Sequence, residues 1–133
     1  MNDASPLRNG FVVVDKEPGW TSHDVVARTR KKLDTRKVGH SGTLDPPATG
    51  LLILGVGRAT RLLRFITDLP KRYTATMVLG RETTTLDAEG QVTDVQDPSG
   101  ICLEDLQKVG SNYLGEILQI PPMVSAVKVE GKR

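Results

Sequence analysis

The sequence of 133 residues predicts an α+β fold, built on a mixed and mainly antiparallel sheet that is flanked by short helices. Two observations lead to this prediction. Short apolar, β-branched runs are interleaved with short amphipathic stretches, and hairpin-type turns occur in the second half. A hydrophobic content of 38% over this length suits one compact core, so we expect one globular unit.

The N-terminal part of the chain is predicted to form a strand, a turn and a helix, because the spacing of its apolar residues changes along the sequence. Residues 11–14 form an apolar run after Gly10, which predicts a buried strand, and Pro18-Gly19 predicts a turn. Thr21 or Ser22 can cap the helix that follows. The remaining faces of this helix are basic, whereas its apolar side consists of Val25, Val26, Thr29 and Leu33.

Residues 36–50 have no hydrophobic period and contain three glycines and two prolines, so we expect a long ordered loop, a kind of segment that often carries function. A second buried strand is predicted over 51–56. A short helix is predicted over 59–69, with inward-facing Leu62, Leu63 and Ile66.

In the second half, the alternation of Tyr73, Ala75, Met77 and Leu79 predicts a strand over 72–80. Residues 87–90 predict a turn into a strand over 91–95. An amphipathic helix is expected over 103–114, and two further strands over 116–120 and 124–129.

Charge is distributed unevenly along the chain. Residues 1–73 carry 13 Lys and Arg against 7 Asp and Glu, whereas residues 74–133 carry 5 against 9, although the net charge is only +2. A basic surface on residues 28–37 and 58–64 is therefore a candidate site for nucleic-acid phosphates. The alternative is an ordinary solvated surface balanced by acidic loops.

Several classes of protein are excluded by what the sequence lacks. Cys102 is the only cysteine, so no internal disulfide can form, and we expect a buried thiol in a reducing, cytoplasmic protein. We find no membrane span or secretory signal, and expect a soluble protein. Gly55-Val56-Gly57 lacks a third glycine, no phosphate-loop motif occurs, and two histidines with one distant cysteine make no zinc site. No cofactor and no metal are therefore predicted.

The remaining candidate for chemistry is the loop of residues 37–50. Asp45 is its only carboxylate, and Pro46 biases Asp45 toward an extended conformation, so the side chain is offered from a stiff support, as a nucleophile or general base requires. The alternative is that Asp-Pro merely opens a turn, with His40 a satisfied loop histidine. These local features do not select a reaction.

Residues 39–50 resemble the active-site motif of the TruB family of tRNA pseudouridine-55 synthases, and the resemblance runs from about Gly10 to the last residue. Ser41, Pro47 and Val124 depart from the usual family residues. The matching segments, in order, are Asp15-Lys16 with Pro18-Gly19 and Thr21-Ser22-His23-Asp24; Gly39-His40-Ser41-Gly42-Thr43-Leu44-Asp45-Pro46 with Ala48-Thr49-Gly50; Lys71 with Tyr73 and Ala75; Leu79-Gly80 with Thr83, Thr85, Asp87 and Gly90; and Pro121-Pro122 with Ser125-Ala126 and Lys128.

The resemblance implies that uridine is flipped from the T-loop of tRNA and isomerised, with Asp45 as the nucleophile and no metal or organic cofactor. Tyr73 would stack on the flipped base and assist proton transfer, although it could instead be a strand-core aromatic. His40 would occupy the vacated place, and His23 would be structural. Gly39 and Thr43 join the substrate-binding residues. Supporting roles fall to Lys16, Asp87 and Lys128.

The resemblance also implies sequence beyond Arg133: an arginine that pairs with the catalytic carboxylate, and an accessory RNA-binding domain. We therefore expect residues 1–9 to be a flexible N-terminus and residues 10–133 to be the first portion of a catalytic domain, monomeric and weakly active or inactive alone. Two alternatives stay open: an RNA-binding or RNA-folding module without chemistry, and a guide-RNA-dependent pseudouridine synthase.

Overall fold

The computed structural model describes residues 8–119. Its internal contacts divide the chain into two compact units, Met1–Tyr73 and Thr74–Arg133, so the prediction of one globular unit is wrong. The physical reason lies in burial: all the buried hydrophobic residues of the described chain belong to the first unit. Composition alone did not reveal this uneven distribution. Each unit is described by itself below.

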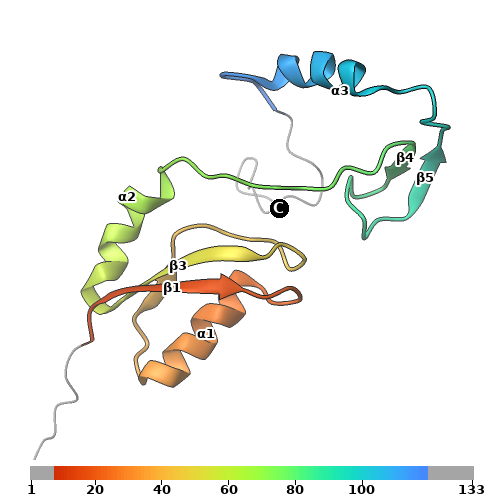
Figure 1. The fold of residues 1–133 in the computed structure, drawn as a ribbon. Coiled ribbons are helices and arrows are strands. Elements are labelled where there is room, and N and C mark those ends of the chain that lie inside the picture. Colours follow the sequence, from red (N-terminus) through yellow and green to blue (C-terminus); the bar gives the residue numbers. More distant parts are fainter. Residues whose placement is uncertain (1–7, 120–133) are drawn as a thin grey trace, which may run out of the picture. The chain divides into compact units, whose positions relative to one another are not determined.

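The first unit contains a three-stranded antiparallel sheet with the strand order β1-β3-β2 (Figure 1). Its strands are β1 (Gly10–Lys16), β2 (Val38–His40) and β3 (Gly50–Val56). Strands β1 and β3 match the predicted runs. Strand β2 lies inside the segment that was expected to be loop, because Val38 pairs with Val56 and is only 3% exposed.

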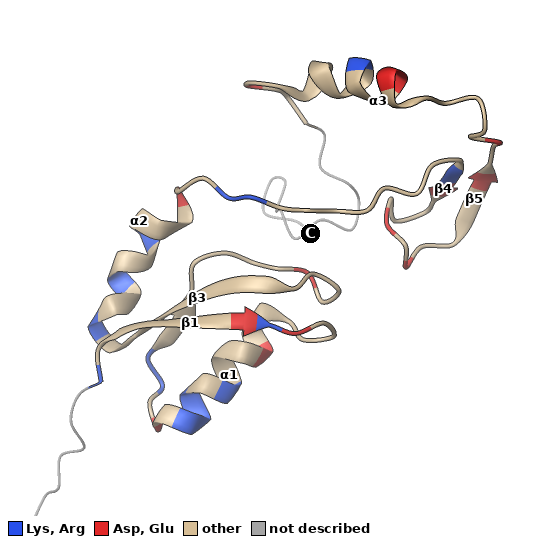
Figure 2. Cartoon of the chain, viewed as in Figure 1, with Lys and Arg blue, Asp and Glu red and all other residues tan. Residues whose placement is uncertain are grey.

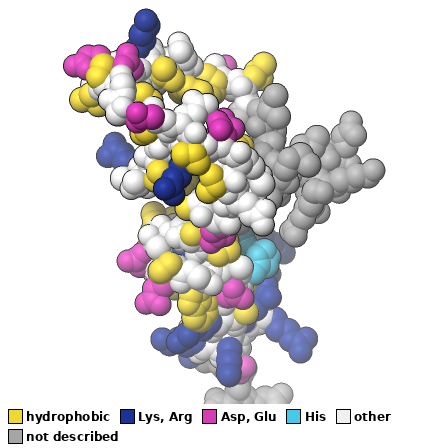
Figure 3. Space-filling model, turned by 90° about the vertical axis from the view of Figure 1, so that its right-hand side faces the viewer, with side chains coloured by type: hydrophobic (Ala, Val, Ile, Leu, Met, Phe, Trp, Pro, Cys, Tyr) yellow, Lys and Arg dark blue, Asp and Glu magenta, His cyan; other side chains and the backbone are white. Residues whose placement is uncertain are grey.

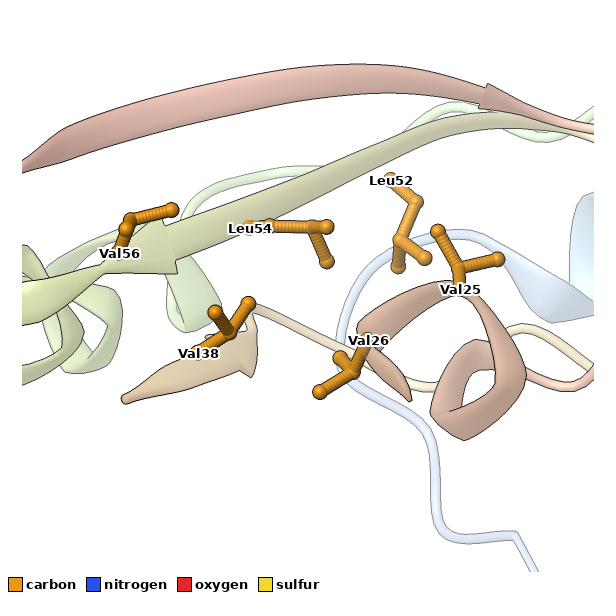
Figure 4. Packing of buried hydrophobic residues seen from close by; sticks show 6 residues of the cluster. All are labelled: Val25, Val26, Val38, Leu52, Leu54 and Val56. Atoms are coloured by element: carbon orange, nitrogen blue, oxygen red, sulfur yellow. The ribbon is translucent and has the colours of Figure 1, made fainter. Parts of the chain in front are cut away.

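Helix α1 (Ser22–Leu33) packs against one face of this sheet and begins at Thr21, as its sequence predicts. The Thr21 hydroxyl accepts a hydrogen bond from the Asp24 amide, and the Asp24 carboxylate accepts one from the Thr21 amide, which forms a reciprocal cap. Figure 4 shows the resulting core between the helix and strands β2 and β3. It consists of Val25, Val26, Val38, Leu52, Leu54 and Val56.

Two glycines let the next helical segment lie close to the sheet. Gly39 and Gly55 are paired across β2 and β3, and a Cβ added at either would lie 3.3 Å or 3.0 Å from the Leu63 side chain. The segment comprises the 3₁₀ helix η1 (Gly57–Leu62) and α2 (Leu63–Thr67), in place of the single helix predicted over 59–69. Leu63 is buried as predicted, but Leu62 is 48% exposed, so its inward assignment is wrong.

No strand forms over residues 71–78, so the strand predicted for 72–80 is wrong. Tyr73, Met77 and Val78 are all more than 60% exposed. An alternating pattern describes the side chains, but a strand also needs a hydrogen-bonded neighbour, and among residues 8–119 none pairs with this segment. The alternating pattern therefore predicted a strand, but it could not predict whether a second strand would pair with it.

The second unit holds a two-stranded antiparallel hairpin, β4 (Arg81–Thr83) and β5 (Val92–Val95), followed by α3 (Leu103–Gly110) and the 3₁₀ helix η2 (Ser111–Tyr113). The predicted turn, strand and helix in this region are confirmed within a few residues. Residues 116–119 form no strand, and the positions 120 and 124–129 lie outside the described residues.

Cys102 is exposed rather than buried, contrary to prediction. It lies at the start of α3, where the Asp105 carboxylate accepts hydrogen bonds from its amide and from its thiol. The residue is therefore used as a helix cap in place of a core side chain.

The chain is held in place from Asn9 onward, where the Asn9 side chain accepts a hydrogen bond of 2.6 Å from the Arg58 amide. No helix within residues 8–119 has the length and apolar character needed to cross a membrane.

The substitution Gly55→Ala should lower the free energy of unfolding by about 1–3 kcal/mol, because its Cβ would lie 3.0 Å from the backbone of Ala59 and Thr60 and from Leu63. Gly110→Ala is the matched control, since no atom lies within 4 Å of its added Cβ, and it should be neutral or slightly stabilising. Urea unfolding of both variants measures the difference. Equal effects would contradict the packing role of Gly55.

Candidate active site

The loop that carries Asp45 connects β2 to β3 and returns to the sheet at the end of β1. Strand β1 ends at Lys16, which is paired with Gly50, the first residue of β3. The turn after β1 and the loop before β3 therefore lie at the same end of the sheet (Figure 1). This register brings residues 16–22 against residues 44–46, although 22 to 30 positions separate them in sequence.

Asp45 opens a tight turn, in which the Ala48 amide donates a hydrogen bond of 3.0 Å to the Asp45 carbonyl. The turn expected of an Asp-Pro pair is thus present. The Asp45 side chain is exposed, and no hydrogen bond or ion pair engages its carboxylate within residues 8–119. The backbone of Asp45 is constrained while its carboxylate is open to a ligand.

On the C-terminal side of Asp45, the Pro46 carbonyl is held by two donors. The Gly19 amide donates at 2.8 Å, and the Lys16 ammonium donates at 3.2 Å. Lys16 is only 1% exposed, and its ammonium also donates to the carbonyls of Trp20 at 2.7 Å and Glu17 at 3.1 Å. This buried charge therefore joins the turn after β1 to the Asp45 loop.

On the N-terminal side of Asp45, both backbone groups of Leu44 are held by Ser22. The Leu44 amide donates to the Ser22 hydroxyl oxygen at 2.9 Å, and that hydroxyl donates to the Leu44 carbonyl at 3.3 Å. Ser22 is the first residue of α1 and is 1% exposed. The residues before and after Asp45 are therefore both held by partners distant in sequence.

His40 lies at the end of β2, half-buried. Its Nδ1 donates to the Gly42 carbonyl at 2.7 Å, because a carbonyl oxygen can only accept. The His23 ring contacts it edge to face, with 5.1 Å between the ring centroids. One ring nitrogen of His40 is thus hydrogen-bonded within the chain, and His23 is its neighbour from the first turn of α1.

A cleft of about 510 Å³ lies beside the loop, within the first unit. It is lined by residues 41–44 of the loop, by the edge of β3 and by the segment that ends at Tyr73, but Asp45 and His40 are not lining residues. Tyr73 is 67% exposed and belongs to no strand, so the strand-core interpretation of this aromatic is wrong. A second cavity of about 470 Å³, between β1 and α1, contains no loop residue.

The other predicted site residues lie in several places. Thr43 lines the cleft, whereas the contacts of Gly39 are packing contacts in β2. Asp87 lies in the β4–β5 turn of the second unit, where hydrogen bonds from the Thr85 hydroxyl and then the Glu89 amide lower its pKa. Lys128 lies outside the described residues. Among residues 8–119 no group of His, Cys, Asp and Glu side chains could hold a metal ion.

Basic side chains are concentrated on the helical segments of the first unit, α1 and η1–α2 (Figure 2). Figure 3 shows Lys and Arg side chains projecting from one face. Three of the predicted phosphate contacts also have protein partners, and one of these is Arg64, which lies over the Phe65 ring at 4.7 Å. Arg28 lies over the Trp20 ring at 5.2 Å, and the Arg30 guanidinium donates to the Val38 carbonyl at 2.8 Å. Arg58, Arg61 and Arg64 are exposed.

Ser22 and Gly19 are the residues that sequence reasoning did not place at the site. Both occur in segments that predict a turn and a helix cap and that carry part of the family resemblance, but no contact with the Asp45 loop was predicted for them. Their contacts with Leu44 and Pro46 depend on the strand register, which no local pattern specifies.

Comparisons with known proteins show the family of the chain. The sequence model described as TruB family pseudouridylate synthase (N terminal domain) matches residues 30–133. The chain is 57% identical over 124 residues to tRNA pseudouridine synthase B of Rhodococcus jostii (strain RHA1), covering 93% of this chain and 41% of that protein. It is 53% identical over 128 residues to the protein of that name from Thermobifida fusca (strain YX), covering 96% and 43%.

A solved structure, the crystal structure of a Cbf5-Nop10-Gar1 complex, contains a chain that matches this one at a TM-score of 0.59 and 31% identity. The match covers 90% of this chain and 31% of the other. The predicted α+β fold of an incomplete pseudouridine synthase domain is thereby confirmed. The chain spans about two fifths of the length of the curated relatives that it matches.

The cap that holds the first turn of α1 should depend on pH. Hydrogen bonds from the Thr21 hydroxyl and then the Thr21 amide lower the pKa of Asp24 below its ordinary value of 3.8. The stabilisation is therefore full above that value and is lost as the pH falls through the lowered pKa. The destabilisation caused by Asp24→Ala should be largest near neutral pH and should shrink below about pH 4.

Urea unfolding of both proteins between pH 7 and pH 2.5 measures this change. In a Thr21→Ala background the same substitution should lose part of its pH dependence, because the hydroxyl donor to the carboxylate is gone while the amide donor of residue 21 remains. A difference that stays constant with pH in the presence of Thr21 would contradict the cap.

Proposed function

Because the chain belongs to the TruB family of pseudouridylate synthases, we propose that its protein isomerises uridine to pseudouridine in the T-loop of tRNA, at position 55, with Asp45 as the nucleophile. The observation that carries this proposal is an exposed carboxylate on a backbone held at both neighbouring residues. A nucleophile must be accessible and preorganised, and Asp45 meets both conditions.

The substrate uridine would be extruded from its RNA into the cleft beside the loop, at a cost of a few kcal/mol for unstacking. The volume of about 510 Å³ lies within the range of small-molecule pockets. Tyr73, exposed at the end of the lining segment, would stack on the base. His40 would fill the place that the nucleotide leaves, and Thr43 and Gly39 would complete the binding residues.

The reaction is an isomerisation, so it needs no co-reactant. Asp45 would attack either the anomeric carbon of the ribose or the uracil ring, and the N1–C1′ bond would break. The base would turn and rejoin the ribose through a new C5–C1′ bond, while C5 loses a proton and N1 gains one. The carboxylate is regenerated, as covalent catalysis requires.

Supporting roles are proposed for three residues. Lys16 would hold the loop through the Pro46 carbonyl, and Asp87 would order the β4–β5 turn through Thr85 and Glu89. Lys128 retains its proposed supporting role from the family resemblance alone. We also propose that the protein is a monomer. A cytoplasmic location is proposed as well, because the chain has one cysteine and no internal disulfide is possible within it.

Among the alternatives, an RNA-binding module without chemistry is favoured by the exposed arginines of η1 and α2 alone. The guide-RNA-dependent alternative is less well supported, because the curated relatives named tRNA pseudouridine synthase B reach 57% identity, against 31% for the Cbf5-containing complex. Both alternatives differ from the proposal in one assay: turnover on tRNA without added guide RNA.

The full-length protein should release tritium from a tRNA transcript labelled at C5 of uridine, and Asp45→Asn should reduce this rate on the order of a thousandfold or more while tRNA binding persists. Asp34→Asn is the matched control, because Asp34 is an exposed carboxylate at the C-terminal end of α1, the opposite end from Ser22, and lines no cleft beside the loop. It should retain activity within about threefold. Binding without tritium release by the intact protein would establish the non-catalytic alternative.

Binding of tRNA should weaken steeply with salt, because phosphate contacts release counterions. Arg61→Gln should lower the slope of log K against log salt concentration by about 1 if Arg61 contacts one phosphate. Lys108→Gln in α3, where the nearby residues are acidic, is the control and should leave the slope unchanged. Filter binding between 50 and 300 mM salt measures both. An unchanged slope for Arg61→Gln would remove η1 from the RNA-binding surface.

A further inference from the structure

One buried hydroxyl binds both backbone groups of the residue that precedes Asp45. The Ser22 oxygen accepts from the Leu44 amide at 2.9 Å and donates to the Leu44 carbonyl at 3.3 Å. A hydroxyl has one donor proton and two acceptor lone pairs, so this pair of bonds uses its donor and one acceptor site. With 1% exposure, Ser22 has no access to bulk water as a replacement partner.

The hydroxyl is not needed to start helix α1. Thr21 already caps the helix, through its reciprocal hydrogen bonds with Asp24. Within the described chain, the Ser22 hydroxyl bonds to Leu44 alone and to no backbone group of its own helix. Its hydrogen bonds therefore connect the helix to the loop.

The position of Ser22 is itself well determined. The next residues of the helix, Val25 and Val26, are anchored in the core between α1 and the sheet (Figure 4). The cap fixes the direction of the first turn, and a buried serine on that turn has little freedom to move. The hydrogen bonds of Ser22 thus fix the backbone of Leu44 relative to helix α1, although the loop that contains Leu44 has no regular secondary structure.

We propose that Ser22 is a positioning residue for the reaction: it sets the backbone of Leu44, and through it the place of the Asp45 carboxylate relative to the bound uridine. This inference rests on the proposed function, since it assigns Asp45 the role of nucleophile. Ser22 acts through Leu44 and touches no reacting atom.

The arrangement explains why a second set of contacts exists on the other side. Lys16 and Gly19 hold Pro46, so three consecutive residues are fixed at both ends. Loss of the Ser22 hydroxyl would leave both backbone groups of Leu44 without these partners, so that its position would depend on the packing of its side chain against the core. A displacement near 1 Å from the productive geometry can cost about a hundredfold in rate, so the effect should appear in kcat rather than in affinity.

The test compares Ser22→Ala with Thr29→Val in the full-length protein. Thr29 lies on the same helix and also uses its hydroxyl in a part-buried bond, to the Val25 carbonyl at 2.8 Å, but it does not contact the loop. We expect Ser22→Ala to lower kcat by about 10- to 100-fold with KM changed less than about threefold. Thr29→Val should leave both constants within about threefold.

Hydrogen exchange gives a readout that does not depend on activity. In Ser22→Ala, peptides covering residues 41–50 should exchange about tenfold faster, while peptides from α1 keep their protection. If Ser22→Ala does not fold, Ser22→Cys replaces it, because a thiol is a weaker donor and acceptor of similar size. Ser22→Cys should lower kcat relative to the wild type, by less than the loss expected for Ser22→Ala.

An unchanged kcat in Ser22→Ala or Ser22→Cys, or an equal loss in Thr29→Val, would overturn the positioning role. Asp45→Asn separates this result from failure of the proposed function. If Asp45→Asn is inactive and Ser22→Ala is fully active, only the role of Ser22 is lost. If Asp45→Asn retains full activity, the nucleophile itself is wrongly assigned.

Discussion

The ammonium of Lys16 is buried and donates hydrogen bonds to three carbonyls, those of Glu17, Trp20 and Pro46. A buried charge is costly unless it is fully hydrogen-bonded, so these carbonyls must stay converged for the unit to remain folded. The requirement joins the turn after β1 to the loop before β3. The stability of the first unit and the conformation of the Asp45 loop therefore both depend on the hydrogen bonds of the Lys16 ammonium. A change that displaces the loop should also lower the stability of the unit.

The loop is ordered by fixing its backbone, while the side chain at its centre stays unengaged. Ser22 holds Leu44, and Lys16 and Gly19 hold Pro46, but no described residue binds the Asp45 carboxylate. Backbone restraint therefore fixes the place of the proposed nucleophile and leaves its oxygens open to a ligand, a form of preorganisation that covalent catalysis needs.

Local sequence patterns predicted the elements whose conformation is set by residues adjacent in sequence. The helix of residues 22–33, strands β1 and β3 and the Asp45 turn follow from period, caps and proline, whereas β2 was predicted to be loop. The contacts that make the loop a site could not be predicted in this way, because Ser22–Leu44 and Lys16–Pro46 span 22 and 30 residues and depend on register. Tyr73 shows the converse error: an alternating pattern predicted a strand, but no described segment pairs with it.

The excess of positive charge and the proposed active-site loop occur in the same part of the chain, the first unit. Residues 1–73 carry an excess of six positive charges, whereas residues 74–133 carry an excess of four negative charges. The Asp45 loop, its cleft and the exposed arginines of η1 and α2 all belong to the positive part. Since a polyanion is attracted to the nearest basic field within a Debye length of roughly 10 Å, the phosphates nearest the proposed substrate uridine should be bound by this unit.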